Sequence, residues 1–140
     1  GLLMAVFTDT DELHRVMTDL WAAIKNDKEM AAQLLTSRLI VTFHYREPDG
    51  RLTVDCSDGK EMVITVGDCN KKPVVEMFMK SSVAHDFWLG KVNVPLALIQ
   101  GKIVSKGPVN KALALLPAIK PAYGLYPTVI EKNGLKVSIT

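Results

Sequence analysis

Hydrophobic residues recur along this chain with two different periods. Between residues 8 and 36 they follow the i, i+3, i+4, i+7 spacing of amphipathic helices, which predicts an N-terminal helical pair. Asp11 and Glu12 fall in the first turn of the first helix, where the helix dipole favours negative charge. From residue 39 the period becomes two, which is typical of strands.

Four strands are predicted in the next segment, over 39–45, 51–57, 62–66 and 73–80. Glu47-Pro48-Asp49-Gly50 separates the first two strands and Ser57-Asp58-Gly59-Lys60 the next two, and both carry the residues that turns prefer. Short loops between amphipathic strands are typical of an antiparallel meander with one buried face and one wetter face.

The remainder of the chain predicts short apolar helices over 83–89 and 95–100, a fifth strand over 101–106 and a C-terminal helix over 108–120. Residues 128–140 are weakly patterned, and we assign them no structure. Together these elements predict a single α+β domain over residues 1–140. A five-stranded, mainly antiparallel sheet with short helices occupies 39–106, and helices pack on one of its faces.

Length and composition agree with one soluble domain. The chain has 140 residues, 48% of them hydrophobic, and a net charge of +2, which suits a single domain with a core of its own. No apolar run approaches the ~20 residues of a membrane span, and no secretory signal is recognisable. We therefore expect a cytoplasmic protein.

The charges are distributed unevenly. Residues 1–70 carry 7 basic and 12 acidic side chains, whereas residues 71–140 carry 10 lysines, 3 acidic side chains and no arginine. This is either an ordinary solvated surface or a basic face for an anionic partner, such as a phospholipid surface or the phosphates of coenzyme A. Sequence-specific DNA recognition is disfavoured because arginine is the usual reader of guanine edges, and we expect no nucleic-acid partner.

Motifs for catalysis are missing from the sequence. It contains no GxSxG, HExxH, CxxC, GxxxxGK[ST] or GxGxxG pattern. His14, His44 and His85 have no metal-ligand spacing. The sequence therefore predicts no cofactor, no metal and no enzymatic activity.

The second half of the chain has more apolar helix than a small sheet needs to be covered. This excess fits either a filled core or an apolar tunnel between sheet and helices, in which adaptable methionines suit varied ligand shapes. The candidate lining residues from this pattern are Met77, Met79, Phe87, Trp88, Leu113 and Leu116.

The segment from Gly90 to Ile103 resembles the sterol carrier protein 2 (SCP2-like) family. The family pattern there is glycine-lysine-apolar-asparagine, followed by a short helix that ends in alanine-apolar-apolar-glutamine-glycine-lysine-apolar. The matching positions are Gly90, Lys91, Asn93, Ala97, Gln100, Gly101, Lys102 and the later Gly107. The resemblance extends over residues 39–116 and includes Val75–Ser81, which is similar to the strand before the family's short helix.

The resemblance implies a five-stranded sheet covered by helices on one face and a hydrophobic tunnel that carries sterols, fatty acids, fatty acyl-CoA or phospholipids without covalent chemistry. It implies Gln100 as the polar group inside the tunnel, although a helix C-cap is the alternative role for that residue. The apolar lining that it implies is Phe87, Leu98, Ile99 and Ile103.

The leading hypothesis is a non-catalytic intracellular carrier for a long-chain lipid: a fatty acid, a fatty acyl-CoA, an isoprenoid or a sterol-like molecule. Its lysines would steer it to anionic membrane surfaces. The alternative is an interaction module that accompanies lipid- or quinone-metabolising enzymes without cargo and forms a homodimer through the outward residues Ile40, Val63, Phe78 and Val104. The last residues are not a serine-lysine-leucine peroxisomal address, which agrees with a cytoplasmic location.

Overall fold

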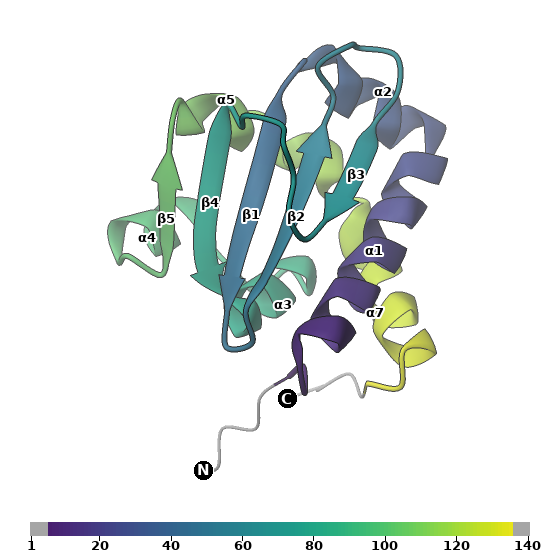
Figure 1. Ribbon diagram of the computed structural model, residues 1–140, viewed down its shortest axis with the longest axis vertical. Coiled ribbons are helices and arrows are strands. Elements are labelled where there is room, and N and C mark those ends of the chain that lie inside the picture. Colours follow the sequence, from purple (N-terminus) through teal and green to yellow (C-terminus); the bar gives the residue numbers. More distant parts are fainter. Residues whose placement is uncertain (1–5, 136–140) are drawn as a thin grey trace.

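The structure is a computed structural model that describes residues 6–135. A layer of helices covers one face of a five-stranded sheet (Figure 1). The elements in chain order are α1 (Thr10–Asn26), α2 (Lys28–Thr36), β1 (Ile40–Arg46), β2 (Gly50–Asp55), β3 (Val63–Val66), β4 (Val75–Lys80), α3 (Ser81–Trp88), α4 (Val94–Ile99), β5 (Ile103–Lys106), α5 (Val109–Leu113), α6 (Leu116–Ile119) and α7 (Ala122–Lys132). The α+β fold with five strands is the predicted fold class.

Aspartate caps start both N-terminal helices. Asp9 Oδ1 accepts a hydrogen bond from the Glu12 backbone N–H at 2.8 Å, and Asp27 Oδ1 accepts one from the Met30 N–H at 2.9 Å. Such caps satisfy amide groups that have no partner within the helix. The two helices occupy the segment in which the hydrophobic spacing predicts them. Their buried residues are Leu13, Val16, Met17, Leu20, Trp21, Ile24, Met30 and Leu34.

The strand order is β3-β2-β1-β4-β5, so the predicted meander is wrong at the fourth strand. Three of the four pairings are antiparallel, whereas β1 and β4 pair in parallel. Residues 67–74 cross over β2 and β1 to bring β4 to the far side of β1 (Figure 1). Side chains alternate between the two faces in either type of pairing, so the period of two does not reveal the direction of a strand.

The outer face of the sheet, which the helices leave uncovered, carries a polar row across all five strands. Thr65, Thr53, Thr42, Glu76 and Lys106 lie in register there. The hydroxyls of Thr42 and Thr53 are 2.9 Å apart. This row matters for the interaction-module hypothesis because a docking surface needs contiguous apolar area.

The four outward apolar residues fall on the two sides of that polar row. Ile40 and Val63 are in register with Asp55 on one side, and Phe78 and Val104 face each other on the other side. The apolar surface that the homodimer hypothesis needs is therefore divided, and that hypothesis stays a prediction.

The predicted C-terminal helix over 108–120 is divided into α5 and α6. Pro117 has no backbone N–H with which to continue the hydrogen-bond ladder of α5, and α6 begins at Leu116 with Pro117 in its first turn. The segment from 128 onward, to which the sequence analysis assigns no structure, begins within a helix, because residues 128–132 belong to α7. Residues 136–140 lie outside the described residues.

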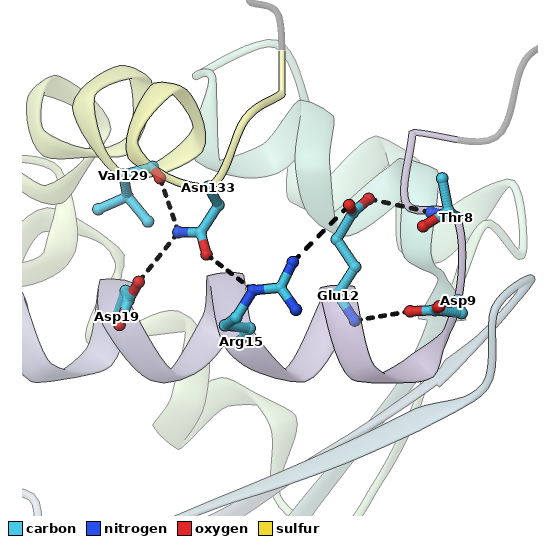
Figure 2. A network of polar contacts seen from close by, with 7 residues as sticks. All are labelled: Thr8, Asp9, Glu12, Arg15, Asp19, Val129 and Asn133. Atoms are coloured by element: carbon cyan, nitrogen blue, oxygen red, sulfur yellow. Dashed lines mark hydrogen bonds and ion pairs between the residues drawn. The ribbon is translucent and has the colours of Figure 1, made fainter.

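Helix α7 is attached to α1 by polar contacts at its C-terminal end (Figure 2). The Asn133 side chain accepts a hydrogen bond from Arg15 Nε at 3.2 Å and donates one to Asp19 Oδ2 at 2.9 Å. Tyr126 and Ile130 of α7 are fully buried. Pro127 would normally argue against a helix here, so it is tertiary packing that secures α7.

Candidate functional site

An apolar cavity of about 100 Å³ lies between the inner face of the sheet and the helices. The strands and the residues beside them contribute Leu39, Val41, Phe43, Tyr45, Val54, Cys56, Met77, Met79 and Ile103. The helices α1 to α4 and the residue after α2 contribute Trp21, Leu34, Ser37, Ala84, Phe87, Trp88 and Val94. The C-terminal helices contribute Ala112, Leu113, Leu115, Leu116 and Ile119. The structure thus has a cavity at the place where a tunnel is predicted, and the tunnel itself stays a prediction.

Seven of the ten predicted site residues line this cavity. They are Met77, Met79, Phe87, Trp88, Ile103, Leu113 and Leu116. The two methionines point inward because they occupy alternate positions of β4, whose odd-numbered residues are buried. Phe87 and Trp88 come from α3, where their rings meet edge to face at 4.8 Å between centroids.

Leu98, Ile99 and Gln100 do not line the cavity. Helix α4 turns Val94 and Ala97 inward, at the i, i+3 spacing of one helix face, and these are its buried residues. Ile99 is consequently 82% exposed. Gln100 is exposed and is the C-cap of α4, with its backbone N–H donating to the Leu96 carbonyl oxygen at 2.9 Å. The C-cap role is therefore the one that the structure gives to Gln100.

The sheet side of the cavity is lined by strand residues that the predicted site does not include. Val41 and Tyr45 of β1 and Val54 of β2 line the cavity and are absent from the predicted site. Trp21 was also missed, although it follows Met17 by one helical turn on α1. The period of each element indicates that these residues are buried, but only the packing of the helices on the sheet shows that a space is left beside them.

The cavity lining carries no ionised side chain in the described part of the chain. Burial raises the pKa of the Tyr45 hydroxyl well above its usual range. Burial, with smaller contributions from Asp55 and Asp58, raises the pKa of the Cys56 thiol to about 11. Both groups are therefore neutral at physiological pH. This environment accepts apolar groups and strongly disfavours an unpaired charge.

One hydrogen-bond donor in the lining has no partner among residues 6–135. The Trp21 side chain is 4% exposed, and its Nε1–H donates to no acceptor in this part of the chain. The Ser37 hydroxyl, by contrast, donates to the Leu34 carbonyl oxygen at 2.7 Å and accepts from the Leu39 N–H at 3.2 Å. An unpaired buried donor costs about 1–3 kcal/mol.

Residues 109–119, the covering segment, comprise α5 and α6 and line one side of the cavity. Leu113, Leu115 and Leu116 are half-buried there. Neither helix has a side-chain cap, and α5 and α6 are only five and four residues long. Isolated helices of this length are unstable in water. The stability of the covering segment therefore depends on the packing of its apolar side chains against the other residues that line the cavity.

A buried polar pair lies behind the cavity. His85 Nδ1 and the Tyr126 hydroxyl are 2.7 Å apart, joining α3 to α7. The ring of Phe7 meets the His85 ring edge to face at 6.0 Å between centroids. Burial lowers the pKa of His85; Asp86 opposes this shift and Lys91 adds to it. His85 is therefore uncharged in the folded protein at neutral pH.

We expect the free energy of unfolding to decrease as the pH falls below about 6.5, the usual pKa of histidine. Because the folded pKa of His85 is lower than the unfolded one, the unfolded chain takes up a proton first, and the contribution of neutral His85 to stability is lost toward acid pH. Urea unfolding at pH 7, 6 and 5 measures this. His85→Gln should be less stable at pH 7 and should have a smaller slope with pH; an unchanged slope would exclude His85 as its source.

Among the described residues, no group of three or more potential metal ligands is found. The same residues contain no helix with the length and hydropathy that crossing a bilayer demands.

The fold and cavity define a small α+β domain in which one sheet face and a layer of helices enclose an apolar space. No family model matches the chain. The chain is 31% identical over 108 residues to non-specific lipid-transfer protein-like 1 of Caenorhabditis elegans, a match that covers 76% of this chain and 88% of that protein. This chain belongs to the sterol carrier protein 2-like family.

Two solved structures show the same fold. The solution structure of the sterol carrier protein domain 2 of Helicoverpa armigera is 23% identical, with a TM-score of 0.64 and coverage of 89% of this chain and 94% of that one. The apo form of sterol carrier protein 2 from Yarrowia lipolytica is 17% identical, with a TM-score of 0.57 and coverage of 86% and 98%.

Proposed function

We propose that this domain is a non-catalytic carrier that binds the apolar tail of a long-chain lipid in the cavity. The observation that carries the proposal is a lining of apolar side chains with no ionised group among the described residues. Burial of a hydrocarbon tail gains about 0.8 kcal/mol per methylene, so this lining suits a ligand that has many methylenes. The name of the Caenorhabditis elegans relative, a non-specific lipid-transfer protein-like protein, supports the same class of ligand.

Binding requires the cavity to widen. Its volume of about 100 Å³ is smaller than the roughly 300–1,000 Å³ of typical ligand pockets. The covering segment is the part that can move, because its helices are short and uncapped and the leucines that it places on the cavity are half-buried. A lipid tail would replace the contacts of Leu113 and Leu116 with contacts of its own, so that opening does not expose the apolar floor to water.

The lining also restricts where the polar end of the lipid can lie. A carboxylate or phosphate inside the cavity would have no cation to pair with among the described lining residues. A charged end therefore stays at the surface, where lysines such as Lys111 and Lys120 are exposed. A neutral acceptor, such as an ester or ketone oxygen, can enter and pair with the Trp21 Nε1–H. Fatty acyl, isoprenoid and sterol-like lipids all fit this rule.

Native mass spectrometry of the freshly purified protein, followed by organic extraction, tests the proposal. We expect a stoichiometric additional mass that extraction releases as a lipid. Delipidated protein should then take up a fluorescent fatty acid, and unlabelled long-chain lipids should displace it. Protein that carries no lipid and takes up neither a fatty acid nor an acyl-CoA would refute the carrier function.

A further inference from the structure

Helix α4 exposes aliphatic side chains to solvent. Ile99 is 82% exposed and Leu96 is 47% exposed. They are three residues apart and therefore lie on the same side of the helix, opposite to the buried Val94 and Ala97. An isoleucine in this state gains little from burial in the fold, and with Leu96 it forms an apolar patch on the outer side of α4.

The surroundings of α4 are basic. Residues 87–130 contain five lysines and no acidic residue, and the nearest carboxylates along the chain are Asp86 and Glu131. The five are Lys91, Lys102, Lys106, Lys111 and Lys120. None of them forms an ion pair within residues 6–135. Lys91 and Lys102 stand just before and just after α4, and both are exposed.

We propose that the outer side of α4 docks this domain on anionic phospholipid bilayers, with Leu96 and Ile99 entering the headgroup region and Lys91 and Lys102 contacting lipid phosphates. Aliphatic residues flanked by lysines are the composition of interfacial membrane-binding elements. Protein–protein interfaces are instead enriched in aromatic residues and arginine and depleted of lysine. The segment 87–130 contains no arginine.

The position of α4 links docking with the cavity. Val94 of α4 lines the cavity, while Leu96 and Ile99 face away from it. A shallow groove beside Val94 is formed by Val92, Leu116, Pro117, Lys120 and Tyr123. Leu116 belongs to the covering segment, so α4 and that segment meet at this groove. The docking proposal does not depend on the carrier function, because it is argued from the exposed side of α4 and not from the cavity.

Cosedimentation with vesicles tests docking, using phosphatidylcholine vesicles with and without phosphatidylserine. We expect binding to the anionic vesicles that weakens steeply as salt rises, because screening shortens the range of the lysine charges. Ile99→Ser should reduce the partition coefficient about tenfold, given the transfer free energy of a buried aliphatic side chain. Lys91→Gln and Lys102→Gln should each reduce it about fivefold.

The matched control is Val63→Ser. Val63 is 45% exposed and lies on β3, at the opposite edge of the sheet from β5, so its loss should leave vesicle binding unchanged. Equal losses for Ile99→Ser and Val63→Ser, full binding by Ile99→Ser, or no binding of the unaltered protein to anionic vesicles would each overturn the proposal. Uptake of a monomeric fluorescent fatty acid in the absence of vesicles reports on the cavity separately, so a failure of docking is distinguishable from a failure of the carrier function.

Discussion

Ala84→Phe should weaken lipid binding by at least about tenfold while the domain stays folded. Ala84 is buried in α3 and lines the cavity, and an apolar cavity of about 150 Å³ is able to hold a benzene ring. The new phenyl group would fill most of the space of about 100 Å³. Two displaced methylenes already amount to a tenfold loss at about 0.8 kcal/mol each. Displacement of a fluorescent fatty acid measures the change.

The matched control for this prediction is Ala32→Phe. Ala32 is an exposed residue of α2, so the same substitution there adds a ring outside the cavity and should leave binding unchanged. Ala84→Leu adds a smaller side chain and should give an intermediate loss. Thermal unfolding of all three variants shows whether they are folded. Normal binding by a folded Ala84→Phe would mean that the lipid does not occupy this cavity.

The second large effect is expected for Gly107→Ala, which should destabilise the domain by about 3 kcal/mol or more. Gly107 has φ +88°, and an added Cβ would overlap the backbone carbonyl oxygen of Val74. The left-handed backbone costs an alanine about 1–2 kcal/mol, and forced overlap in a packed site costs about 1–3 kcal/mol more. Urea unfolding measures the loss, which corresponds to a drop in Tm of roughly 10 °C for a chain of this size.

Gly101→Ala is the control that separates these two causes. Gly101 has φ +74°, but nothing lies within 4 Å of a Cβ placed there. It should therefore cost only the conformational part, about 1–2 kcal/mol. Similar losses for both variants would mean that the contact between Gly107 and Val74 does not constrain the fold. Gly107 also accepts a hydrogen bond from the Val109 N–H at 2.9 Å, so it determines how the covering segment leaves β5.

Residues whose side-chain direction follows from local periodicity were predicted well. Met77 and Met79 alternate with the less buried Glu76, Phe78 and Lys80 on β4, and the structure places both methionines on the cavity. Phe87 and Trp88 lie on α3, whose bounds differ by only one or two residues from those of the helix predicted over 83–89. For such residues the hydrophobic pattern indicates both the type of element and its buried face. This is because one face of the helix or strand is buried along its whole length and the other is exposed.

Prediction failed where the environment of a side chain depends on a distant segment. The short apolar helix α4 has hydrophobic residues around most of its circumference, so its sequence does not indicate which side is covered. Packing against β5 selects Val94 and Ala97 and leaves Ile99 in solvent. The parallel pairing of β4 with β1 was missed for a related reason, because a strand's side-chain alternation is the same beside any neighbour.

The α+β class, the faces of the strands and the N-terminal helices were predictable from the sequence, since these depend on the local period of hydrophobic residues and on caps such as Asp9 and Asp27. It was also clear from the sequence that the predicted lining residues carry no charged side chains. Three features became visible only in the folded protein: β4 lies parallel to β1, α7 packs on α1 despite Pro127, and a space remains beneath α5 and α6. These features depend on how complete elements pack together, and the period within an element carries no information about the neighbour that it meets.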